Sequence, residues 1–383
     1  MQSNMPPQAY ISQDWFQHER ELLFKPLWQF IGLKMMLSQP NAFITRTLCG
    51  MPIVVQNFNG ELRAFENLCA HRQNPLQTQP HGVRPLVCNY HGWGYAEDGK
   101  SNNIPFEAEV FRYSKEEREC LHLRRFKLEV LGNLVFINLS ENPIPISEQF
   151  GDEVMQSMAE ASNAFDSEVI LTTFKGKFNW KLAYENLRDS HHPRYLHARS
   201  LYKAVKFQVL IDEQAVLDAK RLCETGIEDK ALAMSLLRSF SSGGLNEPMQ
   251  NSISYPWHAN VVRYGDKDWY YNWLLFPNLH IASGTGGYSF IIEHHIPVSA
   301  DLTDFMVYYV TAKKKRRYAT SAAVLHAHMM GSEKVLREDI AVMENIQAQL
   351  HPEALSPNLG AYEHANAHIE QWYLHLMEGK FEL

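Results

Sequence analysis

The chain has 383 residues, of which 45% are hydrophobic and 21% are charged, with a formal net charge of −7. This length allows two domains, the composition is typical of a globular protein, and the negative charge argues against a nucleic-acid partner. No run approaches the ~18 apolar residues of a membrane span, and no signal-peptide pattern opens the chain. Five sparse cysteines argue against a disulfide framework, so we expect a cytoplasmic location.

In the first 142 residues, the spacing of apolar side chains changes once, from that of a helix to that of strands. Apolar spacing predicts an amphipathic helix and its exit over Gln13–Leu33, followed by an all-β unit in which Asn59-Gly60 is a hairpin turn. The expected strands of this unit are Phe43–Leu48, Ile53–Phe58, Leu62–Glu66, Leu86–Asn89, Gly92–Ala96, Phe126–Val130 and Leu134–Leu139. Pro143 and Pro145 then mark a boundary.

The remaining residues predict a sheet accompanied by helices. The expected helices lie near Ser147–Ala164, Asn186–Tyr195 with a disturbance at Pro193, Ala231–Leu237, Ala319–Leu350 and Ala361–Met377. The expected strands are Val169–Phe178, Asn260–Tyr264, Trp269–Phe276, His280–Ala282, Tyr288–Pro297 and Phe305–Thr311. The glycine-rich turn 284–287 is read as a hairpin, since no helix follows it.

A Cys/His pattern occurs within the expected all-β unit. Cys69 and His71 form one pair, and Cys88 and His91 form a second pair after 16 intervening residues. Zinc fingers favour two thiolates in one pair and two imidazoles in the other. Mixed pairs suit a [2Fe–2S] cluster in which one iron takes both cysteines and the other takes both histidines. A structural zinc site stays open as the alternative.

A second group of possible ligands lies at Asn179–His197. His192 and His197 are five residues apart, and Asp189 precedes the first by three. Two imidazoles and a carboxylate on one face of a metal leave positions open, which suits ferrous iron that binds dioxygen beside a substrate. A helix that loosens near Pro193 could bring both histidines to one metal. The His192/His197 pair alone is a weak indication of a metal site, but it becomes a strong one because the first motif precedes it in the chain.

Together the two motifs resemble the large (α) subunit of the Rieske non-haem iron oxygenases, the aromatic-ring-hydroxylating oxygenases. The resemblance rests on CAHRQNPLQTQPHGVRPLVCNYHGWGY and on ENLRDSHH followed by His197, and it covers nearly all of the chain. It implies an α+β fold: residues 1–37 as an N-terminal helix on the catalytic domain, 38–150 as an all-β Rieske [2Fe–2S] domain, and 151–383 as a catalytic domain. The catalytic domain should have an antiparallel sheet covered by helices, a helix-grip or START-like arrangement.

The resemblance also assigns roles to individual residues. Cys69, His71, Cys88 and His91 would hold the Rieske cluster, while His192 and His197 would bind the mononuclear Fe(II). The segment VLREDIAVMENIQ matches the family's third-ligand segment, with Asp339 at the ligand position and its neighbour Glu338 as the alternative.

Two departures from the family's pattern leave assignments open. Asn186 and Asp189 are only three residues apart, as in shorter homo-oligomeric members, so a role of Asn186 near the iron is open. His191 stands where a tyrosine or threonine is common, which allows a shifted ligand assignment.

Asp189 has two possible roles. It could cap the helix or hold His192 in one tautomer. In the family, the matching aspartate bridges an iron-ligand histidine to a Rieske histidine of the neighbouring subunit. The resemblance therefore implies that Asp189 faces His91 or His71 of a neighbour in a homotrimer, with electron transfer between subunits.

The implied function is that of a terminal oxygenase. A separate reductase, with or without a ferredoxin, would pass electrons from NAD(P)H to the cluster, and O2 would be activated beside a small aromatic substrate. Demethylation or C–N cleavage of a methoxy compound or quaternary amine is the alternative within the family. A Rieske electron carrier without oxygenase activity is the alternative from another class. The sequence does not select the substrate or reveal a β subunit.

Overall fold

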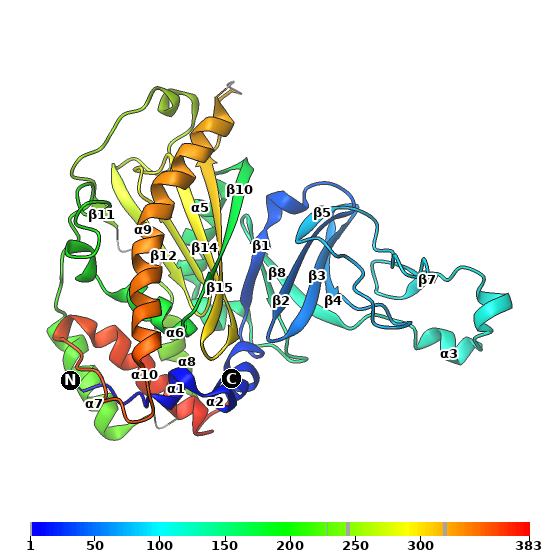
Figure 1. Cartoon of the computed structure of the whole chain (residues 1–383), viewed down its shortest axis with the longest axis horizontal. Helices are drawn as coiled ribbons and strands as arrows, with labels where there is room; N and C mark the ends of the chain where they lie inside the picture. Colours follow the sequence, from blue (N-terminus) through cyan, green and yellow to red (C-terminus); the bar gives the residue numbers. More distant parts are fainter. Residues whose placement is uncertain (1, 228, 243–245, 317–319) are drawn as a thin grey trace. The chain divides into compact units, whose positions relative to one another are not determined.

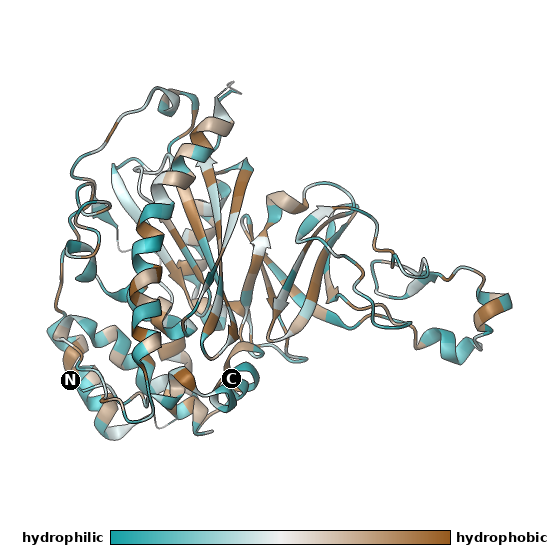
Figure 2. Ribbon diagram, in the orientation of Figure 1, coloured by the Kyte–Doolittle hydropathy of each residue, from teal (hydrophilic) through white to brown (hydrophobic). Residues whose placement is uncertain are grey.

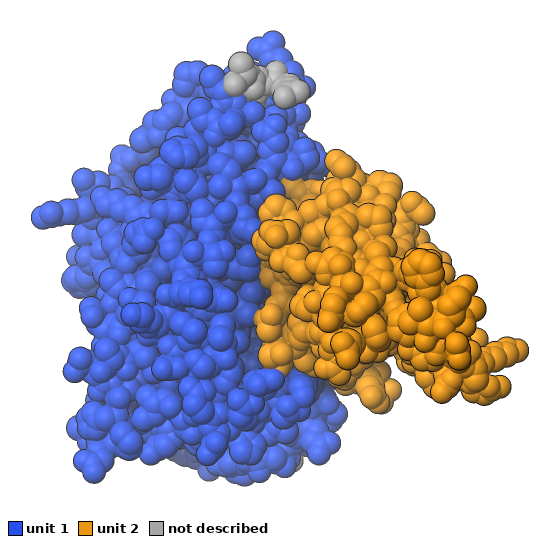
Figure 3. Space-filling view, turned by 45° about the vertical axis from the view of Figure 1, so that its right-hand side comes forward, with its two compact units in different colours: residues 1–27, 144–383 blue, residues 28–143 orange. Residues whose placement is uncertain are grey.

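The computed structural model describes residues 2–227, 229–242, 246–316 and 320–383. The chain forms two compact units, which Figure 3 colours separately. The smaller unit is Trp28–Pro143, and the larger unit combines Met1–Leu27 with Ile144–Leu383. None of the described helices is long and apolar enough to cross a membrane.

The smaller unit is built on an antiparallel sheet. Its strand order is β1-β9-β8-β4-β3-β2-β5, and a separate two-stranded ribbon pairs β6 with β7. The strands are β1 (Gln29–Leu33), β2 (Ala42–Leu48), β3 (Met51–Phe58), β4 (Glu61–Glu66), β5 (His81–Val83), β6 (Gly94–Tyr95), β7 (Ser101–Asn103), β8 (Arg125–Leu131) and β9 (Leu134–Asn138). Asn59 and Gly60 both have positive φ between β3 and β4, which confirms the predicted hairpin turn.

Several elements of the smaller unit differ from the sequence-based predictions. The helix and its exit predicted over Gln13–Leu33 end before Leu33, because Gln29–Leu33 is the buried strand β1 paired with β9. This pairing also makes the compact unit begin at Trp28 rather than at residue 38. Residues 86–89 form a loop with one isolated bridge at Val87, and only Gly94–Tyr95 of the predicted strand 92–96 is a strand. The irregular backbone in this region forms part of the Cys/His loops instead.

The larger unit contains a six-stranded antiparallel sheet, as predicted from the long alternating runs. Its order is β10-β15-β14-β13-β12-β11. The strands are β10 (Phe165–Gly176), β11 (Glu247–Pro248), β12 (Trp269–Leu275), β13 (Leu279–Ser283), β14 (Ser289–Ser299) and β15 (Leu302–Ala312). Turn 284–287 joins β13 to β14 as a hairpin, and no strand forms at 260–264, where a 3₁₀ turn spans Pro256–Asn260.

Helices accompany this sheet, and the longest of them lies along one face (Figure 1). They are α1 (Gln8–Ile11), α2 (Gln13–Glu19), α4 (Ile146–Phe150), α5 (Asp152–Asn163), α6 (Trp180–Arg188), α7 (Glu213–Thr225), α8 (Lys230–Ser239), α9 (Ser321–Gln349) and α10 (His364–Met377). The helix predicted over 147–164 is split because Gly151 takes φ +75°. The sequence did not predict α7, and residue 319, the predicted start of α9, lies outside the described residues.

The apolar side of α9 packs on the sheet. Leu336 belongs to a buried cluster with Phe305, Val307 and Tyr309 of β15. Figure 2 shows hydrophobic segments along the strands and an alternation of hydrophobic and hydrophilic turns along α9. Met329 and Ile340, also on α9, pack against the same cluster as Leu336, so these three side chains face the sheet.

The N-terminal helices are anchored by a buried polar cluster within the larger unit. Glu19 at the end of α2 accepts hydrogen bonds from Trp180 Nε1 at 3.0 Å, from Lys181 Nζ at 2.5 Å and from the Tyr373 hydroxyl. Tyr10 donates a hydrogen bond to Glu185 at 2.6 Å, and desolvation raises the pKa of that carboxyl to about 7. These contacts tie α1 and α2 to α6, the helix that leads into the second predicted metal site.

Candidate metal centres

Two loops of the smaller unit carry the Cys/His pairs, and they share one backbone pattern. In the first, the Cys69 N–H donates to the Asn74 carbonyl at 2.9 Å and the Gln73 N–H donates to the Cys69 carbonyl at 2.8 Å. In the second, the Cys88 N–H donates to the Trp93 carbonyl at 2.8 Å, and the N–H four residues after Cys88 donates back at 3.0 Å. Each loop thus presents a cysteine and a histidine from a closed turn.

The four predicted cluster residues come together at these loops. The cysteines are each 2% exposed, whereas His71 is half-buried and His91 is exposed. The His71 and His91 rings lie 4.6 Å apart between centroids, and the His71 ring stacks on the buried Trp93 ring at 4.9 Å. Burial lowers the pKa of His71, and His91 adds to that shift. The neutral imidazole that results is the form that binds a metal.

The donor atoms fit a [2Fe–2S] cluster. His71 Nδ1 is buried and has no hydrogen-bond partner among the described residues, which suits a nitrogen that binds a metal. The Tyr95 hydroxyl lies 3.1 Å from Cys69 Sγ, and Asn74 Nδ2 donates to Cys88 Sγ at 3.6 Å. Hydrogen bonds to cysteine sulfurs stabilise the thiolate form and tune the potential of such clusters.

The second centre begins where α6 ends. The helix predicted over Asn186–Tyr195, with a disturbance at Pro193, ends earlier than predicted: α6 stops at Arg188, Asp189 is extended with ψ 105°, and a 3₁₀ turn spans His192–Arg194. Asp189 Oδ1 accepts the backbone N–H groups of His191 at 2.7 Å and His192 at 3.2 Å. Its carboxylate therefore caps the short turn, which is the local role considered for it in the sequence.

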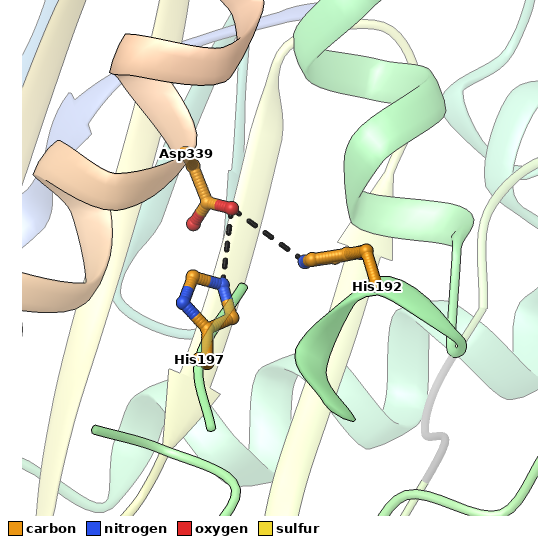
Figure 4. Close-up of side chains that lie close together, drawn as sticks. All are labelled: His192, His197 and Asp339. Carbon is orange, nitrogen blue, oxygen red and sulfur yellow. Dashed lines mark hydrogen bonds and ion pairs between the residues drawn. The ribbon is translucent and has the colours of Figure 1, made fainter. Parts of the chain in front are cut away.

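Three side chains converge at this centre, as Figure 4 shows. His192 Nε2 lies 3.5 Å and His197 Nε2 lies 3.0 Å from Asp339 Oδ1, and all three ligand atoms lie within 4.8 Å of one another. The third residue is on α9, whereas the histidines follow α6. Two imidazoles and a carboxylate arranged in this way fit a mononuclear iron site with open positions.

Neighbouring polar groups hold these side chains in place. His197 Nδ1 lies 2.8 Å from Glu338 Oε2, which also accepts the Ser200 hydroxyl at 2.6 Å. Each ring nitrogen of His197 therefore faces a carboxylate, Glu338 at Nδ1 and Asp339 at Nε2. With Nε2 given to a metal, the proton on Nδ1 would be donated to Glu338. Glu338, the alternative ligand in the sequence, thus points to the other ring nitrogen of His197. Asn186 Nδ2 donates to Asp339 Oδ1 at 3.3 Å, which places Asn186 beside the cluster.

The electrostatics of the centre reflect burial and close pairing. Burial acts against ionisation of Asp339, but hydrogen bonds from His192 and His197 outweigh it and lower the pKa of the carboxyl. Burial likewise disfavours a charged His197, yet Asp339 and Glu338 raise its pKa. His191 stands apart from the three: its ring packs against Tyr195 at 5.2 Å and Tyr362 at 5.5 Å.

A large cavity of about 730 Å³ opens beside this centre. It lies between α9 and the sheet, and the three clustered residues form part of its wall together with apolar side chains such as Leu187, Ile291 and Val335. Ligand cavities of this size suit small organic molecules.

Sequence reasoning missed three polar residues of the cavity wall. These are Asn272 on β12, His280 on β13 and Glu293 on β14. The signal that could have found Glu293 is the period of two along β14, which places Ser289, Ile291, Glu293 and His295 on one face. His295, two residues beyond Glu293 on the same face, also lines the cavity.

Comparisons with known proteins agree with this geometry. The family described as "Ring hydroxylating alpha subunit (catalytic domain)" matches residues 167–379, and the Rieske [2Fe–2S] domain matches residues 27–114. The large oxygenase component of a naphthalene 1,2-dioxygenase system from Pseudomonas putida is 28% identical over 200 residues, covering 49% of this chain and 43% of that protein. A carnitine monooxygenase oxygenase subunit from Acinetobacter pittii is 29% identical over 191 residues, covering 49% and 50%. The matched part of the chain thus spans about half the length of these curated relatives.

Solved structures show the same fold. A quaternary ammonium Rieske monooxygenase superimposes with a TM-score of 0.70 at 19% identity, covering 99% of this chain and 95% of that one. A naphthalene 1,2-dioxygenase with indole bound superimposes with a TM-score of 0.64 at 18% identity, covering 99% and 95%. With the catalytic-family match extending over more than half of its length, this chain belongs to the ring-hydroxylating oxygenase alpha subunits, with a Rieske [2Fe–2S] domain preceding the catalytic domain.

Proposed function

We propose that this chain is the terminal oxygenase component of a multicomponent Rieske oxygenase. The observation that carries the proposal is the His192–His197–Asp339 cluster at the wall of a largely apolar cavity. An electron carrier needs no such cavity beside a second metal centre, so this arrangement argues against a carrier without oxygenase activity. The reaction proposed is hydroxylation, by mono- or dioxygenation, of a small, mainly apolar organic substrate.

The residues that would hold the two cofactors follow from the geometry. Cys69, Cys88, His71 and His91 would bind the Rieske cluster, and the three clustered residues near α6 and α9 would bind Fe(II). When bound, the cluster stores and passes single electrons, and the iron supplies the open positions at which O2 is activated next to a substrate.

The protein's own groups would orient and seal the reaction site. Glu338 and Ser200 fix the ring of His197, while Asn186 holds the Asp339 carboxylate by a hydrogen bond. The apolar walls of the cavity would exclude water and place the substrate beside the iron, which is the protein's main contribution when a cofactor carries the chemistry.

Partners and location belong to the same proposal. Electrons from NAD(P)H would arrive through a reductase or ferredoxin, which fits a cytoplasmic location. His91 is exposed and could receive them. We also propose a homotrimer in which Asp189 faces a cluster histidine of the adjacent subunit; a structural relative was described in terms of inter-subunit electron transfer.

Demethylation or C–N cleavage of a quaternary amine remains the second candidate, because the carnitine monooxygenase subunit and the naphthalene dioxygenase component match this chain equally well. A single-turnover experiment under ¹⁸O2 separates the two. The reduced, iron-loaded protein would be given either naphthalene or carnitine, and the products analysed by mass spectrometry. Labelled naphthalene products support the main proposal, loss of trimethylamine from carnitine supports the second, and the absence of any O2-dependent product from a wider panel of substrates would contradict both.

A further inference from the structure

The cavity has a polar end that the metal cluster does not use. Its members are Asn272, His280, Glu293 and His295, which lie on neighbouring strands and all line the cavity (Figure 1 shows β12 and β14). His280 and Glu293 are 4% and 3% exposed, and His295 is 6% exposed. Polar side chains buried to this degree normally have hydrogen-bond partners. An atom of this group without a partner therefore indicates where a ligand group can bind.

His280 is held firmly from both sides. Its Nδ1 lies 2.8 Å from Glu293 Oε2, on the paired strand β14, and its Nε2 lies 2.6 Å from Asn272 Oδ1. The proton shared by His280 and Glu293 can sit on Nδ1 or on Oε2. In either case, the other carboxyl oxygen of Glu293 is an acceptor. That oxygen, Oε1, has no hydrogen-bond donor among the described residues and belongs to a side chain that lines the cavity.

His295 provides a hydrogen-bond donor that complements the acceptor oxygen of Glu293. It follows Glu293 by two residues on β14, so both side chains project from one face of the strand. Its ring stacks on Phe305 at 4.5 Å between centroids, and its ring nitrogens have no partner among the described residues. Burial lowers the pKa of His295 to about 3, with the nearby His280 adding to the shift, so the ring is neutral and offers one donor and one acceptor.

We infer that Glu293 and His295 bind the hydroxyl group of a neutral, otherwise apolar substrate. A hydroxyl can donate to Glu293 Oε1 and accept from the His295 N–H at the same time. This inference rests on the proposed function, because it treats the cavity as the substrate site, and it narrows the substrate class to phenols and alcohols.

The charges around the cavity disfavour an anionic substrate. Among the described lining residues, Lys334 is the only lysine or arginine, and its side chain is exposed on α9. A carboxylate placed against Glu293 Oε1 would meet a lone pair rather than a donor, and it would share the cavity with Asp339. Aromatic acids should therefore bind weakly.

A set of four bicyclic probes tests the inference: 2-naphthol, naphthalene, 2-methoxynaphthalene and 2-naphthoate. Dissociation constants would be measured by fluorescence with the iron-loaded protein, without reductant or oxygen. We expect 2-naphthol to bind about 10-fold or more tightly than naphthalene and 2-methoxynaphthalene, because only the naphthol donates to Glu293, and 2-naphthoate to bind weakest. Equal affinity of naphthol and its methyl ether, or tight binding of naphthoate, would overturn the inference.

Two variants locate the effect. Glu293→Met and His295→Phe should each remove most of the preference for naphthol over naphthalene while naphthalene still binds. Ser289→Ala, on the same face of β14, should keep the preference. If Glu293→Met fails to fold, His295→Phe carries the test alone, and an unchanged preference in a folded variant contradicts the assignment. Because no electrons or O2 are involved, failure here is distinguishable from failure of the oxygenase proposal.

Discussion

The two candidate metal centres are assembled in different ways. The Cys/His loops span residues 69–93, and each loop is closed by its own backbone hydrogen bonds. The second centre joins His197 to Asp339, 142 residues later in the chain. The first centre is therefore largely a matter of local turn chemistry, whereas the second depends on the packing of α9 against the sheet and on the end of α6.

This difference indicates what each centre should be sensitive to. The loops should tolerate damage to the larger unit, because their hydrogen bonds lie within the smaller unit. The second centre should be lost when α6 or α9 shifts, because no local turn holds all three ligands. The following substitutions separate the two centres, beginning with the largest expected effect.

Removal of one ligand from each centre should empty that centre alone. Asp339→Ala should abolish O2-dependent activity and reduce bound iron from about three to about two atoms per chain while the cluster signal persists. Cys88→Ser should lose the cluster. Iron analysis and EPR spectroscopy of both variants check this, and a loss of cluster signal in Asp339→Ala would contradict the independence of the centres.

Lys181→Met should destabilise the larger unit by about 3–5 kcal/mol, because it leaves the buried Glu19 carboxylate without its cation. Arg238→Met is the matched control on another helix, where the ion pair with Glu148 is exposed and its loss should cost about 1 kcal/mol or less. Urea unfolding followed by tryptophan fluorescence measures both. Equal costs for the two variants would show that the buried cluster does not anchor α6.

Glu338→Gln should weaken iron binding at the second centre by about 10- to 100-fold, since it removes the carboxylate that orients His197. Glu333→Gln, five residues earlier on α9 and paired with Arg337, should leave iron binding unchanged. Competition with a chelator gives the affinities. An unchanged affinity in Glu338→Gln would mean that packing alone orients the histidine.

The smallest effects concern the two loops. Gln73 has φ +55° where the second loop has Gly92 with φ +73°. Gln73→Gly should stabilise the smaller unit by about 0.5 kcal/mol, because relief of the left-handed strain exceeds the added flexibility of the unfolded chain. Gly92→Ala should destabilise it by about 1–2 kcal/mol, and its Cβ would also lie 3.1 Å from Pro105 Cγ. Unfolding followed by cluster absorbance checks both, and the same sign for both would contradict the equivalence of the loops.

The sequence predicted the parts of the fold that have local signatures. The Asn59-Gly60 turn, strands β10 and β12–β15 and the mixed Cys/His pairs each follow from nearby residues, whereas β11 was not predicted and the strand expected at 260–264 does not form. The helix predicted from Asn186 to the disturbance at Pro193 ends at Arg188 instead, because the Asp189 carboxylate accepts two backbone N–H groups. The buried strand β1 was read as helix because a short apolar run carries no clear period.

The choice of third ligand came from family resemblance rather than from local pattern. Glu338 and Asp339 are adjacent, and only the packing of α9 decides which of them faces His192. The sequence also did not predict the contact between His280 and Glu293 at the polar end of the cavity. These residues meet across paired strands, and the pairing register was not known.

Metal and sulfide analysis of protein purified without oxygen, combined with EPR spectroscopy of the dithionite-reduced sample, tests the central claim most directly. We predict a Rieske-type signal with about three irons and about two sulfides per chain, corresponding to one cluster and one mononuclear iron. About two irons with the same signal, even after incubation with excess Fe(II), would contradict the assignment of His192, His197 and Asp339. Zinc without an EPR signal would contradict both centres.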